Sequence, residues 1–331
     1  MEESGAGEAG DRRAAPASLA KLAPGTSEAG GEQPRASPLC ATDANARLYA
    51  SANLGPDGLE GLSWESRKTP ELLHHRLFEC RTCDLVYANP APTPDVIQRA
   101  YEDAPFASGE EAKHAARTYA GLVRPLLRGI PDKTGALDVG TGDGAFLAEL
   151  LAGGFTEVAG IEPSRAPRES ARDGLRELIR PGFFEGSEFP PATMRLVTCF
   201  MTLEHLPDPL AFCRAARALL KADGVLLVAA HDRRAVPNRI MGGRSPIHDV
   251  EHLQLFSPCS LATMLARAGF SGVRTWKYTN TYSLRYWIRL LPFSAHVKGF
   301  LARMAEQTGA GSFPVSLPAG NMAAAGYRRA E

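Results

Sequence analysis

Short apolar runs alternate with amphipathic stretches over most of the chain after residue 90. Apolar residues at helical spacing predict helices at about 93–101 and 109–128. The runs that predict strands lie at about 135–140, 156–161, 179–184, 194–201, 224–231, 271–279 and 321–329. Helical patterns separate the first five strands and precede the sixth, and this alternation predicts a doubly wound, mostly parallel α/β sheet.

The sequence ALDVGTGDG at 136–144 joins the first predicted strand to a predicted helix at 145–151. Gly140, Gly142 and Gly144 stand at alternate positions, and glycine is required where a turn is tight or where the backbone touches a ligand. A strand, a glycine loop and a helix in this order hold an adenosine-containing cofactor at the carboxyl end of the first strand.

Two acidic residues help to decide which cofactor this loop binds. Gly140, Gly142 and Ala145 also satisfy the dinucleotide pattern G-x-G-x-x-G/A. Asp138, two residues before the first glycine, is poorly placed for a pyrophosphate and suits a cofactor with a cationic amino-acid end. Glu162 ends the second predicted strand and can accept hydrogen bonds from both hydroxyls of a ribose. The loop is not followed by G-K-[ST], which excludes a P-loop.

Four segments in a fixed order resemble the motifs of class I S-adenosylmethionine-dependent methyltransferases. They are DVGTGDG at 138–144, Glu162, LVTCFMTLEHLPDP at 196–209 and LLKADGVLLV at 219–228. The resemblance covers about 130–331. It implies a Rossmann-like sheet of seven strands, the last of them antiparallel, and S-adenosylmethionine as the cofactor.

The resemblance also implies where the cofactor lies. Its carboxylate would meet the N–H groups of 142–145, its ammonium Asp138 or the Gly140 carbonyl, and its ribose Glu162. Phe183 and Phe184 are candidates for the adenine slot, with core packing as the alternative, and Tyr119 lines the cofactor site or packs in the core. The predicted cofactor-binding residues are Asp138, Gly140, Thr141, Gly142, Gly144, Glu162, Pro163, Phe184, Phe200, Met201 and Glu204.

Histidines at the expected mouth of the cleft are the catalytic candidates. A hydroxyl acceptor loses its proton during methyl transfer, and His205, directly after the fourth strand, has a suitable reference pKa for a general base. His248 and His252 lie in a long polar connection at 245–257, where substrate-binding groups are common. The alternative for all three is a structural role in capping or holding these loops.

The segment around His205 also resembles the E-x-x-E-H motif of ubiquinone-pathway O-methyltransferases, in which acidic residues and histidine hold a divalent metal. Met201 stands at the first glutamate position here. A thioether is a poor ligand for hard cations, so we expect no metal at this site.

A cysteine module is predicted at residues 37–92. Cys80 and Cys83 form a C-x-x-C knuckle, Cys40 lies upstream, and Ser37 takes the place of a fourth cysteine. The segment resembles the ribbon-like module that precedes many methyltransferases of this type. Three thiolates with Asp43 or a water could hold a structural zinc ion, and the alternative is a ribbon that keeps its fold without the metal.

These assignments divide the chain into a disordered tail at 1–36, the cysteine module, and a methyltransferase domain at 93–331. The domain has its core at 130–279 and 319–331, and segments at about 232–256 and 280–318 are expected to cover the acceptor. A membrane-surface role for 286–293 is a less favoured alternative, because the segment contains few basic residues.

Composition limits the remaining possibilities. The 331 residues carry no formal net charge, which argues against a nucleic-acid partner. We expect no signal peptide and no membrane span, and six cysteines of this spacing are typical of reduced thiols in the cytoplasm. The sequence therefore predicts a cytoplasmic methyltransferase that acts on a small molecule, at a hydroxyl of a natural product or sugar. The alternatives are an NAD(P)-dependent oxidoreductase and a non-catalytic cofactor-binding protein.

Overall fold

The computed structural model describes residues 31–55, 64, 71–106, 109–291 and 293–329. The disorder predicted for residues 1–30 lies outside this part of the chain. Residues 31–36 correct the predicted end of the tail, because β1 (Glu32–Gln33) pairs antiparallel with β5 (Ala91–Pro92). Arg35 also donates a hydrogen bond to the carbonyl of Leu253 at 3.2 Å. The segment before residue 37 therefore takes part in the fold.

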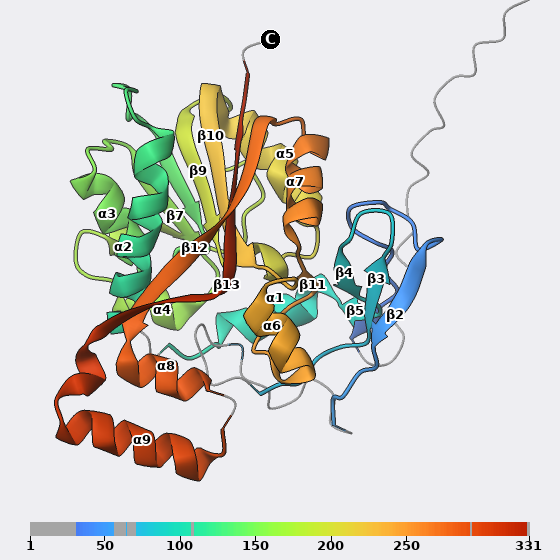
Figure 1. The fold of residues 1–331 in the computed structure, drawn as a ribbon. Helices are drawn as coiled ribbons and strands as arrows, with labels where there is room; N and C mark the ends of the chain where they lie inside the picture. The colour runs from blue at the N-terminus through green and yellow to red at the C-terminus, as the bar shows by residue number, and fades with distance from the viewer. Residues whose placement is uncertain (1–30, 56–63, 65–70, 107–108, 292, 330–331) are drawn as a thin grey trace, which may run out of the picture.

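A seven-stranded sheet with the order β12-β13-β10-β9-β6-β7-β8 forms the centre of the molecule (Figure 1). All neighbouring pairs from β10 to β8 are parallel, whereas β13 is antiparallel to both β10 and β12. The predicted fold class is confirmed, including the antiparallel strand. The strands are β6 (Ala136–Val139), β7 (Val158–Glu162), β8 (Ile179–Pro181), β9 (Met194–Phe200), β10 (Leu220–His231), β12 (Ser271–Ser283) and β13 (Pro314–Tyr327).

Helices cover both faces of this sheet, and alternate residues of each strand face opposite layers. In β10, Leu226 and Val228 belong to the buried cluster that contains side chains of α5 and α7. Val225 and Leu227 belong to the cluster with α2 and α3. The helices of the two layers and of the edge are α1 (Pro94–Glu102), α2 (Gly109–Leu126), α3 (Ala145–Ala152), α4 (Arg165–Ser170), α5 (Pro209–Leu219) and α7 (Pro258–Arg267).

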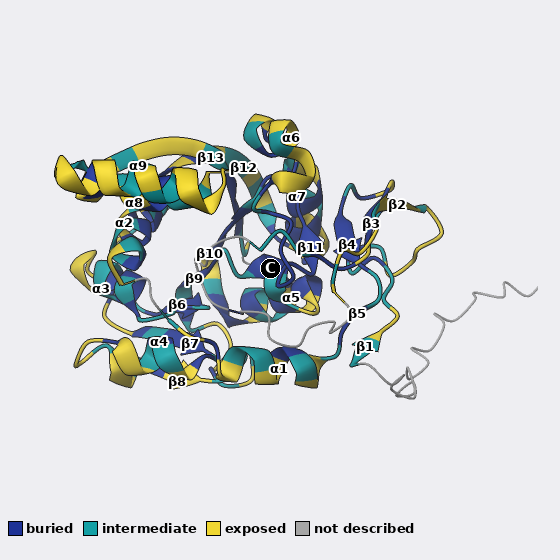
Figure 2. Ribbon diagram, turned by 90° about the horizontal axis from the view of Figure 1, so that it is seen from below, coloured by how far each residue is buried: buried dark blue, intermediate teal, exposed yellow. Residues whose placement is uncertain are grey.

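The last two strands are longer than the sequence predicts. β12 and β13 continue past the sheet as an antiparallel pair, with Ser283 opposite Pro314, because each strand supplies backbone partners for the other. The segment between them forms two helices that lie at the same end of the molecule as α6 (Figures 1 and 2). These elements are α6 (Val236–Met241), α8 (Leu284–Leu290) and α9 (Ala295–Gln307), with short 3₁₀ turns η1 (Arg176–Leu178), η2 (Leu203–His205), η3 (Gly242–Arg244) and η4 (Ala310–Ser312).

The cysteine module contributes three strands to a second sheet with the order β11-β4-β3-β2. Its edge strand β11 comes from the long connection after β10 and pairs antiparallel with β4. The module is therefore joined to the larger domain by main-chain hydrogen bonds. The strands are β2 (Ala46–Ala50), β3 (Leu77–Cys80), β4 (Val86–Ala88) and β11 (Gln254–Leu255).

A buried arginine strengthens this junction. The Arg233 guanidinium, which follows β10, forms ion pairs with Glu79 and Asp84 of the module. Burial opposes ionisation of Glu79, but hydrogen bonds from Arg47 and Arg233 outweigh it and lower the pKa of that carboxyl. Both carboxylates thus pair with a cation supplied from the other part of the chain, and Glu79 also pairs with Arg47 of the module itself.

We expect Arg233→Met to lower the free energy of unfolding by about 3 kcal/mol, because two carboxylates lose a buried cation. Arg234→Met is the matched control, since the Arg234 side chain also contacts Asp84 but is 58% exposed. Its expected loss is below about 1 kcal/mol. Urea denaturation of both variants measures the difference, and equal losses would contradict the role assigned to Arg233.

Candidate functional site

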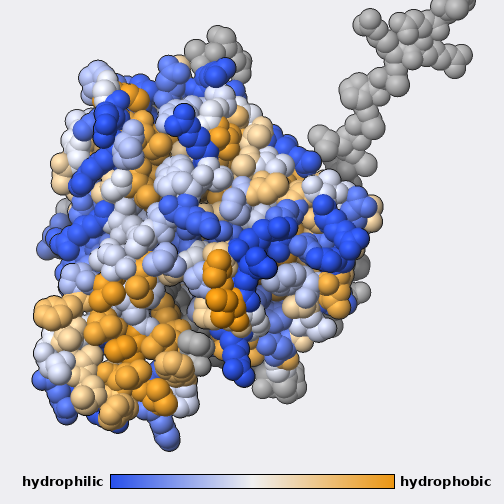
Figure 3. Space-filling model, viewed as in Figure 1, coloured by the Kyte–Doolittle hydropathy of each residue, from blue (hydrophilic) through white to orange (hydrophobic). Residues whose placement is uncertain are grey.

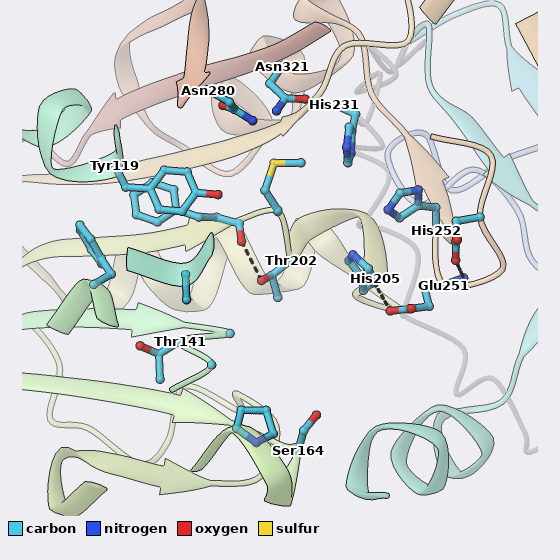
Figure 4. Close-up of a pocket in the computed structure, with 18 of the residues that line it drawn as sticks. Tyr119, Thr141, Ser164, Thr202, His205, His231, Glu251, His252, Asn280 and Asn321 are labelled. Atoms are coloured by element: carbon cyan, nitrogen blue, oxygen red, sulfur yellow. Dashed lines mark hydrogen bonds and ion pairs between the residues drawn. The ribbon is translucent and has the colours of Figure 1, made fainter. Parts of the chain in front are cut away.

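A cavity of about 620 Å³ lies at the carboxyl ends of the parallel strands (Figure 4). Its wall combines the glycine loop after β6, the residues after β9 and β10, the 246–252 segment, and the β12–β13 pair with α8. Of the predicted site residues, those that line it are Asp138, Gly140, Thr141, Gly142, Glu162, Pro163, Phe184, Phe200, Met201, His205 and His252.

The glycine loop lies close to the chain after β9. Gly140 has φ of +78°, and a Cβ atom there would lie 2.2 Å from the Thr202 hydroxyl oxygen. Only glycine permits both this backbone conformation and this approach. Gly144 also has positive φ and precedes α3, but the structure does not place it in the cavity wall.

Glu162 is held in place by the backbone of two loops. Its carboxylate accepts the N–H of Gly142 at 2.8 Å and that of Ser164 at 2.9 Å, one on each oxygen. Burial raises the pKa of Glu162. Each carboxylate oxygen can accept more than one hydrogen bond, so capacity remains for a ligand in the cavity.

Asp138 and Thr141 present further polar atoms at the same wall. The Thr198 hydroxyl donates to Asp138 at 2.6 Å, and burial raises the pKa of Asp138 to about 7. A cation beside this carboxyl would favour its ionised form. The Thr141 hydroxyl is buried and has no hydrogen-bond partner among the described residues.

Aromatic side chains form the apolar part of the wall. Tyr119 is buried, lines the cavity and stacks on Phe200 with ring centroids 4.1 Å apart. Phe184 packs edge-to-face on Phe212 of α5 at 5.3 Å and also lines the cavity. Tyr119 and Phe184 therefore each pack against other aromatic side chains and also line the cavity. Both alternatives from the sequence, core packing and cavity lining, apply in part.

A chain of hydrogen bonds ends at His205. Tyr101 of α1 donates its hydroxyl hydrogen to Glu251 at 3.0 Å, and its oxygen lies 2.6 Å from His205 Nδ1. The Glu251 carboxylate also lies 3.4 Å from His205 Nδ1 directly, as the dashed line in Figure 4 marks. Because the Tyr101 hydrogen is used on Glu251, Nδ1 of His205 is the donor in its bond to the Tyr101 oxygen, which leaves Nε2 with a free lone pair. Burial favours the neutral imidazole, but the Glu251 carboxylate outweighs it and raises the pKa of His205.

Two more histidines surround His205 (Figure 4). The ring of His252 lies 4.9 Å from that of His205 and 5.2 Å from that of His231. His252 Nδ1 donates to the carbonyl of Ile247 at 2.8 Å. Burial, and then the neighbouring His205 and His231, lower the pKa of His252 to about 4. His252 therefore stays neutral at physiological pH, whereas His205 is the stronger base.

Glu204 and His248, both predicted site residues, lie outside the cavity wall. Glu204 is completely buried and accepts the backbone N–H of His231 at 2.7 Å. Burial opposes its ionisation, but the bond to His231 and nearby histidines lower the pKa of Glu204 to about 2. The His248 ring lies instead against His74 at 5.5 Å and Tyr49 at 6.1 Å, in the cysteine module.

Three polar side chains near the histidines were not among the predicted site residues. Tyr101 looks like a core aromatic of an amphipathic helix, so its sequence position carries no signal of this role. Asn280 and Asn321 lie on neighbouring strands and line the cavity, and the Oδ1 atom of each is buried without a hydrogen-bond partner among the described residues. Unpaired amide oxygens at a cavity wall are suited to bind a ligand donor.

Within the described part of the chain, one group of side chains has the spacing of metal ligands. The Sγ atoms of Cys40, Cys80 and Cys83 all lie within 4.8 Å of one another, and those of Cys40 and Cys80 are 3.8 Å apart. The Ser37 hydroxyl is 3.6 Å from Cys83 Sγ, where a fourth ligand would stand. Burial raises the pKa of Cys83 to about 12, whereas N–H groups of Cys83 and Thr82 outweigh burial and lower the pKa of Cys80.

Comparison with known proteins places these features in a family. A family model described as "Methyltransferase domain" matches residues 112–275. A protein named ubiquinone biosynthesis O-methyltransferase from Aliivibrio fischeri (strain MJ11) is 30% identical over 166 residues, which cover 45% of this chain and 70% of the relative. A protein of the same name from Vibrio cholerae serotype O1 (strain M66-2) is 30% identical over 166 residues, 45% of this chain and 67% of the relative.

Similar solved structures include the YcgJ protein of Bacillus subtilis, with 17% identity and a TM-score of 0.47 over 66% of this chain and all of that one. Phosphoethanolamine N-methyltransferase 2 of Haemonchus contortus, in complex with S-adenosyl-L-methionine, has 15% identity and a TM-score of 0.43 over 74% of this chain and 63% of that one. The curated relatives and the family model, together with the strand order, show that the chain belongs to the class I S-adenosylmethionine-dependent methyltransferases.

Proposed function

We propose that the protein transfers the methyl group of S-adenosylmethionine to a hydroxyl oxygen of a small molecule, with His205 as the general base. The observation that carries the proposal is the contact of both Tyr101 and Glu251 with His205 Nδ1 at the cavity wall. Both partners of Nδ1 favour the tautomer with Nε2 unprotonated, and the Glu251 carboxylate raises the pKa of the ring. Both effects favour proton removal from a bound hydroxyl.

The glycine-loop side of the cavity would hold S-adenosylmethionine. Glu162 would bind the ribose hydroxyls, Asp138 the ammonium, and Thr141 a polar group through its unpaired hydroxyl. Phe184 and Phe200 would contact the adenine and the methionine chain, respectively. The cofactor supplies a methyl group activated by a positively charged sulfur. The two buried carboxyls with raised pKa values fit a ligand that brings a cationic group.

The histidine side would position the acceptor. Asn280 and Asn321 would each accept a hydrogen bond from it, which orients the reacting oxygen toward the methyl group. The acceptor oxygen would form a bond to the methyl carbon as the carbon–sulfur bond breaks, and His205 Nε2 would take the hydroxyl proton. Such an in-line displacement depends chiefly on proximity and alignment, which the cavity walls provide.

The acceptor is proposed to be a natural product with a hydroxyl on an aromatic ring rather than a free sugar. Tyr282, Tyr286 and Trp287 line the acceptor side, and a mostly aromatic wall suits a flat apolar molecule. The names of the curated relatives specify an O-methyltransferase, which supports oxygen as the methylated atom.

The proposal is tested by incubating the purified chain with S-adenosylmethionine and a panel of phenols, sugars and amines. The expected result is acceptor-dependent release of S-adenosylhomocysteine with a phenol, and a methyl ether identified by mass spectrometry. Methylation of the amines alone, or of the sugars alone, would contradict the proposed acceptor class.

We also propose that Cys40, Cys80 and Cys83 hold a structural zinc ion. Two thiolates on one tetrahedral zinc, with bonds of about 2.3 Å, are separated by about 3.8 Å, which is the Cys40–Cys80 distance found here. Ser37 stands beside the fourth position, so a water or this hydroxyl would complete the site.

We expect the purified protein to contain about one zinc per chain and Cys83→Ala to lose it. Cys259→Ala is the matched control, because Cys259 is an exposed thiol outside the cluster. Ser37→Cys should slow zinc removal by a chelator, since it supplies a fourth thiolate. Metal analysis that finds no zinc in the unmodified chain would favour the metal-free ribbon.

A further inference from the structure

The end of the molecule that carries α6, α8 and α9 exposes a group of apolar side chains. Figure 3 shows them gathered over α8 and α9, at the lower left. On α9, Val297, Phe300 and Met304 recur at intervals of three and four residues and are exposed, while Ala305 of the same helix is buried. We call this end the apolar face; its exposed large apolar residues are Val236, Ile240, Leu291, Phe293, Val297, Phe300, Met304, Phe313 and Leu317.

Basic residues accompany these apolar side chains. The 236–248 segment contains two arginines and no acidic residue, and the 284–305 segment contains three arginines, one lysine and no acidic residue. Glu306 follows near the end of α9. The whole chain has 37 basic and 37 acidic residues and is therefore balanced. Compared with it, these two segments have a local excess of positive charge. Their exposed arginines are Arg239, Arg244, Arg285 and Arg303.

The apolar face is continuous with the cavity. Met241 of α6 lines one side, and Leu290, Leu291 and Leu317 line the other. Leu291 and Leu317 are also exposed on the apolar face. A ligand that leaves or enters the cavity between α6 and α8 therefore crosses this surface.

We propose that the apolar face docks on an anionic lipid bilayer, with the cavity opening toward the lipid. Apolar side chains would enter the acyl boundary while the arginines contact anionic headgroups. If a second copy of the chain bound to the apolar face, the arginines of the two copies would repel each other. A second copy is therefore a less suitable partner than an anionic bilayer. Among the described residues, no helix is long and apolar enough to cross a bilayer, so the contact would be peripheral. The docking does not depend on the methyl-transfer reaction.

Sedimentation with vesicles tests the proposal. We expect the full chain to bind vesicles of phosphatidylcholine with phosphatidylserine, and to bind phosphatidylcholine alone much less. Phe300→Ser with Met304→Ser should reduce the partition coefficient about tenfold or more. Arg239→Gln with Arg303→Gln should reduce it about tenfold or more, because each arginine near an anionic surface contributes about fivefold.

Matched controls lie on exposed helix positions elsewhere. Leu151→Ser on α3 and Arg214→Gln on α5 should leave vesicle binding unchanged. S-adenosylmethionine titration verifies that each variant is folded. The proposal is overturned if the unmodified chain does not bind the anionic vesicles, or if the variants of the apolar face bind as well as the controls. A dimer in gel filtration that Phe300→Ser dissociates would assign the face to a second copy instead.

Discussion

Replacing His205 by alanine is expected to lower kcat by about 10²- to 10⁴-fold, the usual contribution of a general base. The affinity for S-adenosylmethionine should not change, because His205 belongs to the acceptor side of the cavity. Steady-state kinetics with the acceptor found in the panel, and calorimetry with the cofactor, separate these two effects. A larger loss in His252→Ala than in His205→Ala would transfer the role of base to His252.

The pH dependence distinguishes a base from a structural histidine. His205 must be neutral to accept a proton, so kcat should fall as the pH falls through its pKa. That pKa lies above the ordinary 6.5, because the Glu251 carboxylate stabilises the imidazolium. Glu251→Gln removes this charge and should move the acid limb of the profile to lower pH. An unchanged profile would mean that the Glu251 carboxylate does not act through His205.

Replacing Glu162 by alanine is expected to weaken S-adenosylmethionine binding about 10- to 100-fold, since hydrogen bonds to a charged group contribute roughly 1.5–3 kcal/mol. The substitution removes the acceptor for the ribose hydroxyls and leaves the N–H groups of Gly142 and Ser164 without their partner. Calorimetric titration measures the affinity.

Glu177→Ala is the matched control for this change. Glu177 is exposed on η1, near the same edge of the sheet, so its loss changes the net charge equally without altering the cavity. Equal affinities in the two variants would remove Glu162 from the cofactor site. A Glu162→Ala protein that also loses its cooperative unfolding would show a structural role, so urea denaturation accompanies the titration.

The parts of the fold that sequence predicts well are those set by local spacing. The parallel strands follow from short apolar runs between helices, and the glycine loop follows from three glycines that all adopt positive φ. The extended β12–β13 pair was predicted too short, because residues such as Asn280 and Leu317 are partners across the insertion rather than along the chain. The alternation of apolar and polar residues along one strand does not show which other strand pairs with it.

Contacts between distant parts of the chain also explain why the sequence did not predict how the histidines are arranged. Tyr101 and His205 are 104 residues apart, and only the packing of α1 against the cavity brings them together. His248 and His252 share a polar segment and a residue type, yet one ring faces the cysteine module and the other faces the cavity. Because the segment is not a helix there, spacing of four residues does not place both rings on one side.

The pairing of β4 with β11 makes the cysteine module and the histidine segment a single structural unit. β11 begins two residues after His252, and His75 of the module donates its Nε2 hydrogen to the carbonyl of Val250 at 3.0 Å. A chimaera that takes residues 31–92 from a related protein but keeps its own 245–257 would place a foreign β4 and residue 75 against the native β11 and Val250. We expect this change to displace Glu251. Grafting the two segments together would keep the β4–β11 pairing, and moving Arg233 with them would also keep the ion pairs with Glu79 and Asp84.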